Sequence, residues 1–415
     1  MADLQDDPYD TDTDTTAAAG DLDGPQEDPS AGTVTTDTAS LATPASSAER
    51  ARVLLASHPV VDGHNSLAPT LLRRRGTSHG HDLEQGDTFL DTDMPRIKAG
   101  ALGGQFWSVE ADAEAVREGR AVGSTLELID LVRDLISSYP ESLRLALGAG
   151  DLADARNCGR VASLLGPASG PAMGDSLATL RAFHFLGVRA LSLAGARWAE
   201  DGLSRFGHEV VREMNRLGVI IDLSGTSDET MRATFAVTKA PAMFSHSVAR
   251  AVGEWPGDGG VPDDILTLLG ANNGVCMVSF AAEQLTGERL AHDRFPGERL
   301  ARDRIADDGK GPSLSDVADH VERVREVAGP ECVGLSGTYG RESGTPHTVG
   351  LEDTSCYPLL ITELLDRGWT DTAITDLTWG NAARVLRDTE FLARAAQQRR
   401  PPSTATIEEL DDVRR

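Results

Sequence analysis

Four side chains that can exchange protons or bind a metal lie at the ends of short apolar runs. His64 and His246 each follow such a run, and Asp222 and Tyr339 end two others. Two imidazoles that share one site are typical of divalent-metal binding or of acid–base catalysis. A catalytic metal ion needs about three protein ligands, and the neighbouring residues are mostly Gly, Ala, Ser and Thr. The pattern therefore indicates a polar site that is poor in metal ligands.

Strands and helices that alternate along the chain must position these residues. Runs that are apolar throughout indicate strands buried on both faces of a parallel sheet. Eight such runs are separated by helical patterns, which predicts an α/β fold and specifically a (β/α)8 barrel of the TIM type. A doubly wound open sheet has the same alternation and stays an alternative. In a barrel, the carboxyl ends of the strands form one mouth, where both histidines would lie. The predicted strands are Pro59–Asp62, Gly104–Val109, Arg160–Leu165, Arg189–Leu193, Val219–Leu223, Ala242–Ser245, Gly274–Phe280 and Cys332–Leu335.

Composition divides the chain into a tail, one domain and a second tail. Residues 1–48 hold eleven Asp and Glu, no Lys or Arg and almost no large apolar side chain, which predicts a disordered acidic tail. Residues 49–395 form the predicted barrel domain, and residues 396–415 a flexible C-terminal tail. Within the domain, residues at about 284–312 contain a nearly repeated charged segment, which we interpret as a solvated loop insertion.

Charge and composition exclude several classes of function. The net charge of the 415-residue chain is −26, which argues against a surface for nucleic acid or anionic membranes. The sequence has no apolar run of the roughly 18 residues that a membrane span requires, and no basic and apolar leader. Its four cysteines are far apart, as in proteins of a reducing compartment. We therefore expect a cytoplasmic protein with no nucleic-acid partner and no membrane span.

Eight longer motifs are specific enough to compare with known families. They are Asp62–Asn65, Thr92–Arg96, Gly104–Val109, Phe206–Gly218, Phe244–Ser247, Val261–Asp264, Gly350–Asp353 and Gly380–Val385. With these motifs, the sequence from about His58 to Leu392 resembles the renal or membrane dipeptidases, which are zinc-dependent peptidases. The resemblance implies a barrel of the metal-dependent hydrolase kind and a tendency to form dimers.

The same resemblance implies a two-zinc centre, from which this sequence departs. His64 and His246 match two of the five zinc ligands that the family pattern implies. The other three ligand positions and the position of the catalytic Asp carry residues with weak or no affinity for zinc. These four residues are Ser66, Ala168, Gly225 and Thr338. The resemblance therefore implies a family fold whose metal centre is dismantled, so that no cofactor is expected.

Three functions are compatible with this pattern. The favoured one is a non-hydrolytic homologue that binds a small amino-acid or dipeptide-like ligand, or stabilises a partner in a homodimer or in a heterodimer with an active paralogue. The second is an active dipeptidase in which His64, His246 and either Asp62 or a loop group hold zinc in a substituted site. The third is a metal-independent enzyme that acts on a small amino-acid derivative, with a histidine as acid or base beside Asp222 or Tyr339. For each of these side chains, a purely structural role is the alternative.

Overall fold

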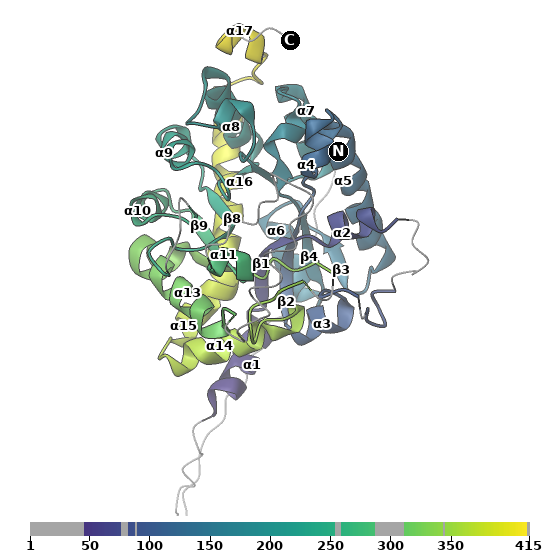
Figure 1. Ribbon diagram of the computed structural model, residues 1–415, viewed down its shortest axis with the longest axis vertical. Helices are drawn as coiled ribbons and strands as arrows, with labels where there is room; N and C mark the ends of the chain where they lie inside the picture. Colours follow the sequence, from purple (N-terminus) through teal and green to yellow (C-terminus); the bar gives the residue numbers. More distant parts are fainter. Residues whose placement is uncertain are drawn as a thin grey trace, which may run out of the picture. The chain divides into compact units, whose positions relative to one another are not determined.

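The computed structural model describes residues 45–75, 82–87, 89–253, 259–286, 311–342 and 345–412. Most of the predicted acidic tail and most of the predicted insertion at about 284–312 lie outside these residues. The described strands form one sheet in the order β3-β4-β2-β1-β10-β9-β8-β7-β6-β5, and all neighbours run parallel (Figure 1). The strands are β1 (Val60–Asn65), β2 (Leu102–Trp107), β3 (Leu143–Leu145), β4 (Val161–Leu165), β5 (Ala168–Ser169), β6 (Ala190–Ser192), β7 (Ile220–Asp222), β8 (Met243–Ser247), β9 (Val275–Ser279) and β10 (Val333–Ser336).

The sheet closes on itself at the end of β4. The carbonyl oxygen of Leu165, the last residue of β4, accepts a hydrogen bond of 2.8 Å from the backbone N–H of Arg189, directly before β6. β5 follows β4 along the chain and pairs with β6, whereas β4 itself pairs with β2. This closure confirms the predicted barrel and excludes the open sheet. All eight predicted strands are present, whereas β3 and β5, with three and two residues, were not predicted.

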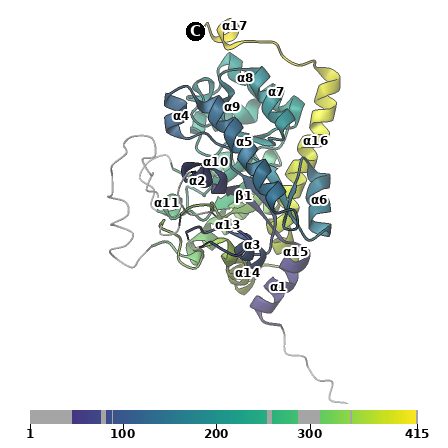
Figure 2. The ribbon, with the colours of Figure 1, turned by 90° about the vertical axis from the view of Figure 1, so that its right-hand side faces the viewer.

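Helices surround the barrel, and α16 packs along α8 and α6 (Figure 2). Among the helices of the described segments, none combines the length and hydropathy that a membrane span requires. The helices are α1 (Ser47–Ser57), α2 (Leu67–Arg73), α3 (Met94–Ala99), α4 (Ala113–Arg117), α5 (Ala121–Ser138), α6 (Ala149–Asn157), α7 (Leu177–Leu186), α8 (Arg205–Leu217), α9 (Asp228–Val237), α10 (Asp263–Ala271), α11 (Ala282–Leu285), α13 (Leu314–Ala328), α14 (Tyr357–Asp366), α15 (Asp371–Thr375), α16 (Asn381–Arg399) and α17 (Ile407–Asp411).

The sequence of α8 shows how local signals set these helices. The Ser204 hydroxyl accepts the backbone N–H of Gly207 at 3.1 Å, which caps the first turn. Gly218 ends the helix with a φ of 81°, a conformation that costs glycine little. Between these ends, Val210 and Met214 are fully buried, four residues apart on one face. The capped ends and the apolar face fix α8 against the barrel.

A buried apolar cluster fills the barrel interior. It joins side chains from seven strands around the ring with the start of α16, so it can form only where those strands face one another. Its strand members are Val61, Phe106, Ala162, Leu164, Ala190, Ile220, Met243, Val275 and Met277. A larger buried cluster packs the outer faces of the strands against the helices.

Two polar side chains of α16 close the barrel floor, at the amino ends of the strands. Asn381 donates through Nδ2 to the carbonyl oxygens of Pro330 (2.9 Å) and Val333 (2.8 Å), at the start of β10. Arg384 donates through Nη2 to the carbonyl oxygens of Gly274 (3.0 Å) and Glu331 (2.8 Å). Both belong to the motif Gly380–Val385, which therefore positions the starts of β9 and β10.

The C-terminal segment differs from its predicted flexible tail. α16 continues to Arg399, beyond the predicted boundary at residue 396, and α17 packs against α8. Ile407 is 2 % exposed, and the Ser204 hydroxyl donates to Asp411 Oδ2 at 2.6 Å. An apolar anchor and a hydrogen-bonded helix cap therefore hold residues 400–412 on the domain, which the polar composition of this segment did not reveal.

Candidate functional site

The carboxyl ends of β1 and β8 bring His64 and His246 together at the barrel mouth. Their ring centroids are 4.3 Å apart, and the ring planes are tilted by 38°. The pKa of each imidazole is lowered to about 4, mainly by burial and to a smaller extent by the nearby charge of Arg341. Both rings are therefore neutral at pH 7. Nδ1 of His64 is buried and has no hydrogen-bond partner among the described residues.

A carboxylate that the sequence prediction did not include, Glu110, lies beside His64. Its Oε2 is 3.3 Å from His64 Nε2 and accepts the Ser108 hydroxyl at 3.2 Å. Burial raises the pKa of Glu110, and the nearby imidazole of His246 partly offsets this effect. Glu110 lies three residues past the end of β2, the neighbour of β1 in the sheet. The search for polar residues directly after apolar runs identified His64. The same search would have identified Glu110 if it had extended further into the loop after β2.

A buried hydrogen-bonded chain orients His246. Asp222 Oδ1 accepts the backbone N–H groups of Ser224 (3.1 Å) and Ser245 (2.9 Å), and its Oδ2 accepts the Ser245 hydroxyl at 2.6 Å. Ser245 Oγ is also 2.7 Å from His246 Nδ1. Burial raises the pKa of Asp222, and the nearby His246 and the hydrogen bonds from Ser245 and Ser224 partly offset this effect. When the carboxyl group is ionised, the Ser245 hydroxyl donates to it, and Nδ1 of the neutral imidazole donates to Oγ. This tautomer leaves Nε2 of His246 with a lone pair.

Tyr339 is not part of this cluster, which corrects the prediction that it lies beside the histidines. Its hydroxyl donates to the carbonyl oxygen of Leu351 at 3.0 Å. Its ring packs edge-on against Tyr357 and Phe280, and burial raises its pKa well above the usual value. The preceding residue, Thr338, has a φ of 52°, which turns the chain so that Tyr339 points into the helical layer. Tyr339 is therefore a packing residue.

Asp62 stabilises the strand ends. Its Oδ1 accepts the backbone N–H groups of His64 (3.2 Å) and Gly337 (3.0 Å), which ties β1 to the end of β10. The side chain is fully buried, and this burial raises its pKa to about 6. Both of these bonds fall on Oδ1, so Asp62 has a structural role at the strand ends, while its buried Oδ2 has no hydrogen-bond partner among the described residues.

The four positions that the family pattern gives to further zinc ligands and to the catalytic Asp offer little to a metal. Ala168 is fully buried in β5, and Gly225 lies in a turn with a φ of 74°. Ser66 precedes α2, and the Thr338 hydroxyl donates to the carbonyl oxygen of Gly337 at 2.7 Å. Across the described ranges, no group of three or more His, Cys, Asp or Glu could hold a metal ion. These four residues therefore supply neither a carboxylate nor an imidazole to a metal ion.

Arg341 brings a positive charge to the same mouth. Its Nε donates to the carbonyl oxygen of Thr338 at 2.9 Å, and its Nη2 donates to the Thr338 hydroxyl at 3.2 Å. Its Nη1 forms an ion pair of 2.8 Å with Glu283 Oε1, after β9. Neither Arg341 nor Glu283 was among the predicted site residues. Arg341 lies in the loop after β10 and Glu283 in the short helix α11, where apolar patterns give no signal.

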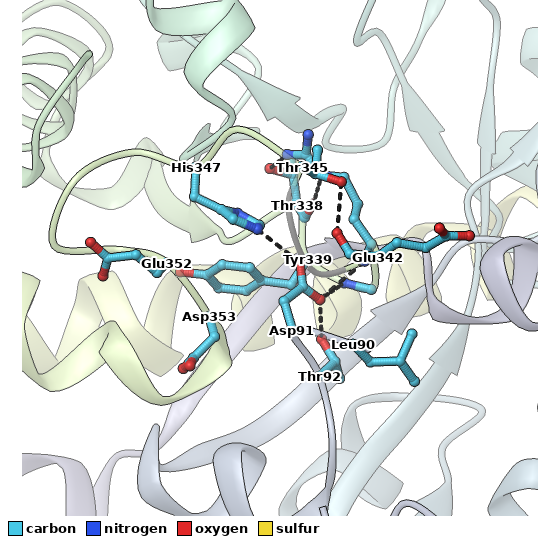
Figure 3. Close-up of polar contacts among 12 residues, drawn as sticks. Leu90, Asp91, Thr92, Thr338, Tyr339, Glu342, Thr345, His347, Glu352 and Asp353 are labelled. Carbon is cyan, nitrogen blue, oxygen red and sulfur yellow. Dashed lines mark hydrogen bonds and ion pairs between the residues drawn. The ribbon is translucent and has the colours of Figure 1, made fainter. Parts of the chain in front are cut away.

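Asp91 fixes the loop that carries Arg341, and Figure 3 shows its carboxylate beside Thr92 and Tyr339. Its Oδ1 accepts the backbone N–H groups of Gly340 (2.7 Å) and Arg341 (3.0 Å) and the Thr92 hydroxyl (3.1 Å). Its Oδ2 is 4.0 Å from Nε2 of His347. Asp91 is 4 % exposed, and burial raises its pKa to about 6. Three accepted hydrogen bonds give this loop one defined conformation.

A cavity of about 440 Å³ lies beside α2 and α5 and borders the site at Glu110. Glu110 lines it, together with side chains that include Arg73 and Arg120. Its lining therefore carries both signs of charge, and its volume suits a small molecule.

Comparison with known proteins places the chain in a family. The model of the membrane dipeptidases, peptidase family M19, matches residues 48–400. The chain belongs to the membrane dipeptidase family. This finding confirms the resemblance on which the zinc positions were assigned.

Curated relatives and solved structures agree with this membership. The chain is 37% identical to Dipeptidase 3 of Macaca fascicularis, over 85% of this chain and 69% of that protein. It is 36% identical to Dipeptidase aclJ of Aspergillus oryzae, over 81% of this chain and 79% of that protein.

Among solved structures, the probable dipeptidase PvdM from Pseudomonas aeruginosa is similar with a TM-score of 0.69 and 19% identity, over 84% of this chain and 99% of that one. A metallopeptidase from Rhodobacter sphaeroides, solved with a phosphinate mimic of the dipeptide L-Ala-D-Ala, gives a TM-score of 0.66 and 21% identity, over 80% and 99% of the two chains. At these identities, the likeness shows the fold alone.

Proposed function

We propose that this member of the membrane dipeptidase family does not hydrolyse dipeptides through a two-zinc centre, and that it binds a small amino-acid or dipeptide-like molecule at the barrel mouth. One observation carries the proposal. The positions for three zinc ligands and for the catalytic Asp hold Ser, Ala, Gly and Thr, while the two remaining imidazoles are paired with Glu110 and Ser245.

The chemistry of peptide hydrolysis explains why these positions matter. Two metal ions that lie about 4 Å apart need a shared anchor, and Ala168 supplies no carboxylate to bridge them. An attacking water needs a positioned base, and Thr338 is a neutral hydroxyl whose proton is donated to a backbone carbonyl. The donors that are left can hold and orient a polar ligand by hydrogen bonds.

The chain from Asp222 through Ser245 to His246 favours a second candidate, a metal-independent acid–base enzyme in the same pocket. The two bonds of this chain, 2.6 and 2.7 Å, leave Nε2 of a neutral imidazole free to accept a proton. Exchange of a ligand's α-proton with D₂O, followed by NMR, separates the two candidates. Exchange that is lost in His246→Asn supports the enzyme, whereas binding without exchange supports the ligand-binding role.

Metal content and peptide turnover of the full chain test the main proposal. The purified protein, incubated with zinc and then desalted, is expected to hold well under one zinc per chain. It is expected to release no amino acid from L-Ala-L-Ala, L-Ala-D-Ala or Gly-Gly. One or two zinc ions per chain, with turnover that a chelator abolishes, would overturn the proposal in favour of a substituted zinc site.

A variant with the family pattern is the matched control. It combines the changes Ser66→Asp, Ala168→Glu, Gly225→His and Thr338→Asp. The nearest atom that a Cβ at Gly225 would meet is 3.7 Å away, so the histidine has room, although its φ of 74° costs a non-glycine residue about 1 kcal/mol. If the folded variant binds zinc where the wild type does not, the missing donors are the cause.

A further inference from the structure

The guanidinium of Arg341 lies where the family pattern has a carboxylate. Its side chain folds back over the end of β10 and donates to both oxygens of Thr338, at 2.9 and 3.2 Å. Thr338 stands at the position of the catalytic Asp. A guanidinium, paired with Glu283, therefore lies beside the position where the family pattern has a carboxylate.

Neighbouring elements hold this guanidinium in place. Glu283, from the short helix α11 after β9, pairs with Nη1 at 2.8 Å, and the side chains of both partners are only about one-fifth exposed (20% and 19%). Asp91 fixes the backbone of Arg341 and Gly340 from the opposite side of the loop. Because hydrogen bonds and an ion pair already restrict the backbone and side chain of Arg341, binding an anion costs it little conformational entropy.

The guanidinium keeps hydrogen-bonding capacity for a ligand. Of its five N–H groups, three bond within the described part of the chain, to Thr338 and Glu283. One N–H is left on each terminal nitrogen, and these two can donate to the two oxygens of a carboxylate.

The strand order sets a second charge on the other side of His64. β1 lies between β2, which leads to Glu110, and β10, which leads to Arg341. Between an acidic and a basic side chain, the mouth presents the imidazoles of His64 and His246. This arrangement is complementary to a small molecule with one positive and one negative end.

We propose that Arg341 is the carboxylate anchor of a metal-independent site at the barrel mouth, that Glu283 positions it, and that Glu110 receives the ammonium end of the same ligand. The ligand class is a small zwitterion that carries a carboxylate and an amine. This assignment deepens the proposed function and rests on it, because a guanidinium here takes over the positive charge that the metal ions would supply.

Ligand-observed saturation-transfer NMR on the full chain, with EDTA present, tests the anchor. The probes are L-Ala-L-Ala, its C-terminal amide, which lacks the carboxylate, and its N-acetyl derivative, which lacks the amine. The wild type is expected to bind the dipeptide at least about tenfold more tightly than the amide, as a charge-assisted hydrogen bond would require. Failure of the dipeptide to bind at 10 mM would overturn the proposal.

Single substitutions test which residues cause the preference for the dipeptide over its C-terminal amide. Arg341→Met is expected to weaken dipeptide binding by about 10- to 100-fold and to remove the preference over the amide. Arg341→Lys keeps the positive charge but cannot form two parallel hydrogen bonds to a carboxylate. Its dipeptide affinity should therefore lie between those of the wild type and Arg341→Met. Arg399→Met, at an exposed arginine that ends α16, is the matched control and should change nothing. A preference for the carboxylate that survives in Arg341→Met would overturn the assignment.

Two further variants complete the test. Glu283→Gln leaves the guanidinium present but without its ion pair, so the carboxylate preference should fall by a smaller factor of about three to ten. This variant also decides the matter if Arg341→Met does not fold. Glu110→Gln should weaken binding of the dipeptide and leave binding of the N-acetyl derivative unchanged. An equal loss of affinity for both probes would contradict the role of Glu110.

The design separates this inference from the proposed function. Dipeptide binding in EDTA that is insensitive to Arg341→Met removes the anchor and leaves the non-hydrolytic role intact. Binding that appears only after zinc is added, together with turnover, overturns both proposals.

Discussion

The floor and the mouth of the barrel treat polar side chains in opposite ways. At the floor, Asn381 and Arg384 donate to backbone carbonyl groups near the starts of β9 and β10, although Nε of Arg384 is buried without a partner in the described segments. At the mouth, His64 keeps a buried ring nitrogen without a partner in the described segments, and Arg341 keeps two N–H groups. The bonds at the floor all end on the backbone, whereas the side chains at the mouth leave donors and acceptors that a ligand can use.

The floor of the barrel matches the family pattern, whereas the mouth departs from it. Gly380–Val385, at the floor, matches the family pattern and has a structural reason to do so, because its side chains position β9 and β10. The mouth departs from the pattern at the zinc positions and has Glu110 and Arg341 near them. A barrel can therefore keep its family fold while the charges at its strand ends differ from the family pattern.

The floor gives the largest expected effect on stability. Asn381 is 3 % exposed, and its amide donates to two carbonyl oxygens. Asn381→Ala removes both bonds and leaves the carbonyls buried, so the free energy of unfolding should fall by about 2–4 kcal/mol. Urea denaturation followed by circular dichroism measures it.

A matched control sharpens this prediction. Asn157 is exposed at the end of α6, so Asn157→Ala should change the free energy of unfolding by less than about 0.5 kcal/mol. Equal effects of the two alanine variants would mean that the floor does not depend on the amide of Asn381.

The fold could be predicted from the sequence because buried parallel strands are apolar throughout. All eight predicted runs are strands of the barrel, and α7 has the bounds Leu177–Leu186 that its apolar spacing indicates. β3 and β5 are too short for any periodicity to show. The docked C-terminal segment was missed because a single apolar residue, Ile407, anchors it.

The site could be predicted only where a side chain lies on a strand. His64 and His246 are strand residues, so the ends of β1 and β8 bring them together. Arg341 lies five residues past β10 and returns to the mouth through a turn at Thr338, which no pattern of residue types specifies. The same turn directs Tyr339 away from the histidines, against expectation. Loop geometry, and not composition, therefore decides which charges face the ligand.

The pH dependence of stability gives an intermediate effect. Asp91 has a pKa of about 6 in the folded chain, against 3.8 for an unperturbed Asp. Because the folded pKa is raised, the folded state binds more protons between these values, and stability is lost as pH rises from about 4 to 6. Asp91→Asn keeps the acceptor for Gly340 and Arg341 and removes this loss.

The expected result is a difference that grows with pH. Relative to wild type, Asp91→Asn should gain about 1–3 kcal/mol in free energy of unfolding between pH 4 and pH 7. Urea denaturation at four pH values measures this, with Asp366→Asn, at an exposed end of α14, as a control whose difference stays flat. A difference for Asp91→Asn that does not vary with pH would show that its carboxyl group ionises freely in the folded loop.

The smallest effect on stability is expected at the mouth itself. His64→Leu removes a buried ring nitrogen that has no partner in the described segments and replaces the ring by an apolar side chain of similar volume. The lost contact to Glu110 costs little, because that carboxylate is 28% exposed and can bind water. The free energy of unfolding should therefore stay within about 1 kcal/mol of wild type, or rise. A fall of more than about 2 kcal/mol in urea denaturation would mean that His64 supports the fold as Asn381 does, and the contrast between the two ends of the barrel would not hold.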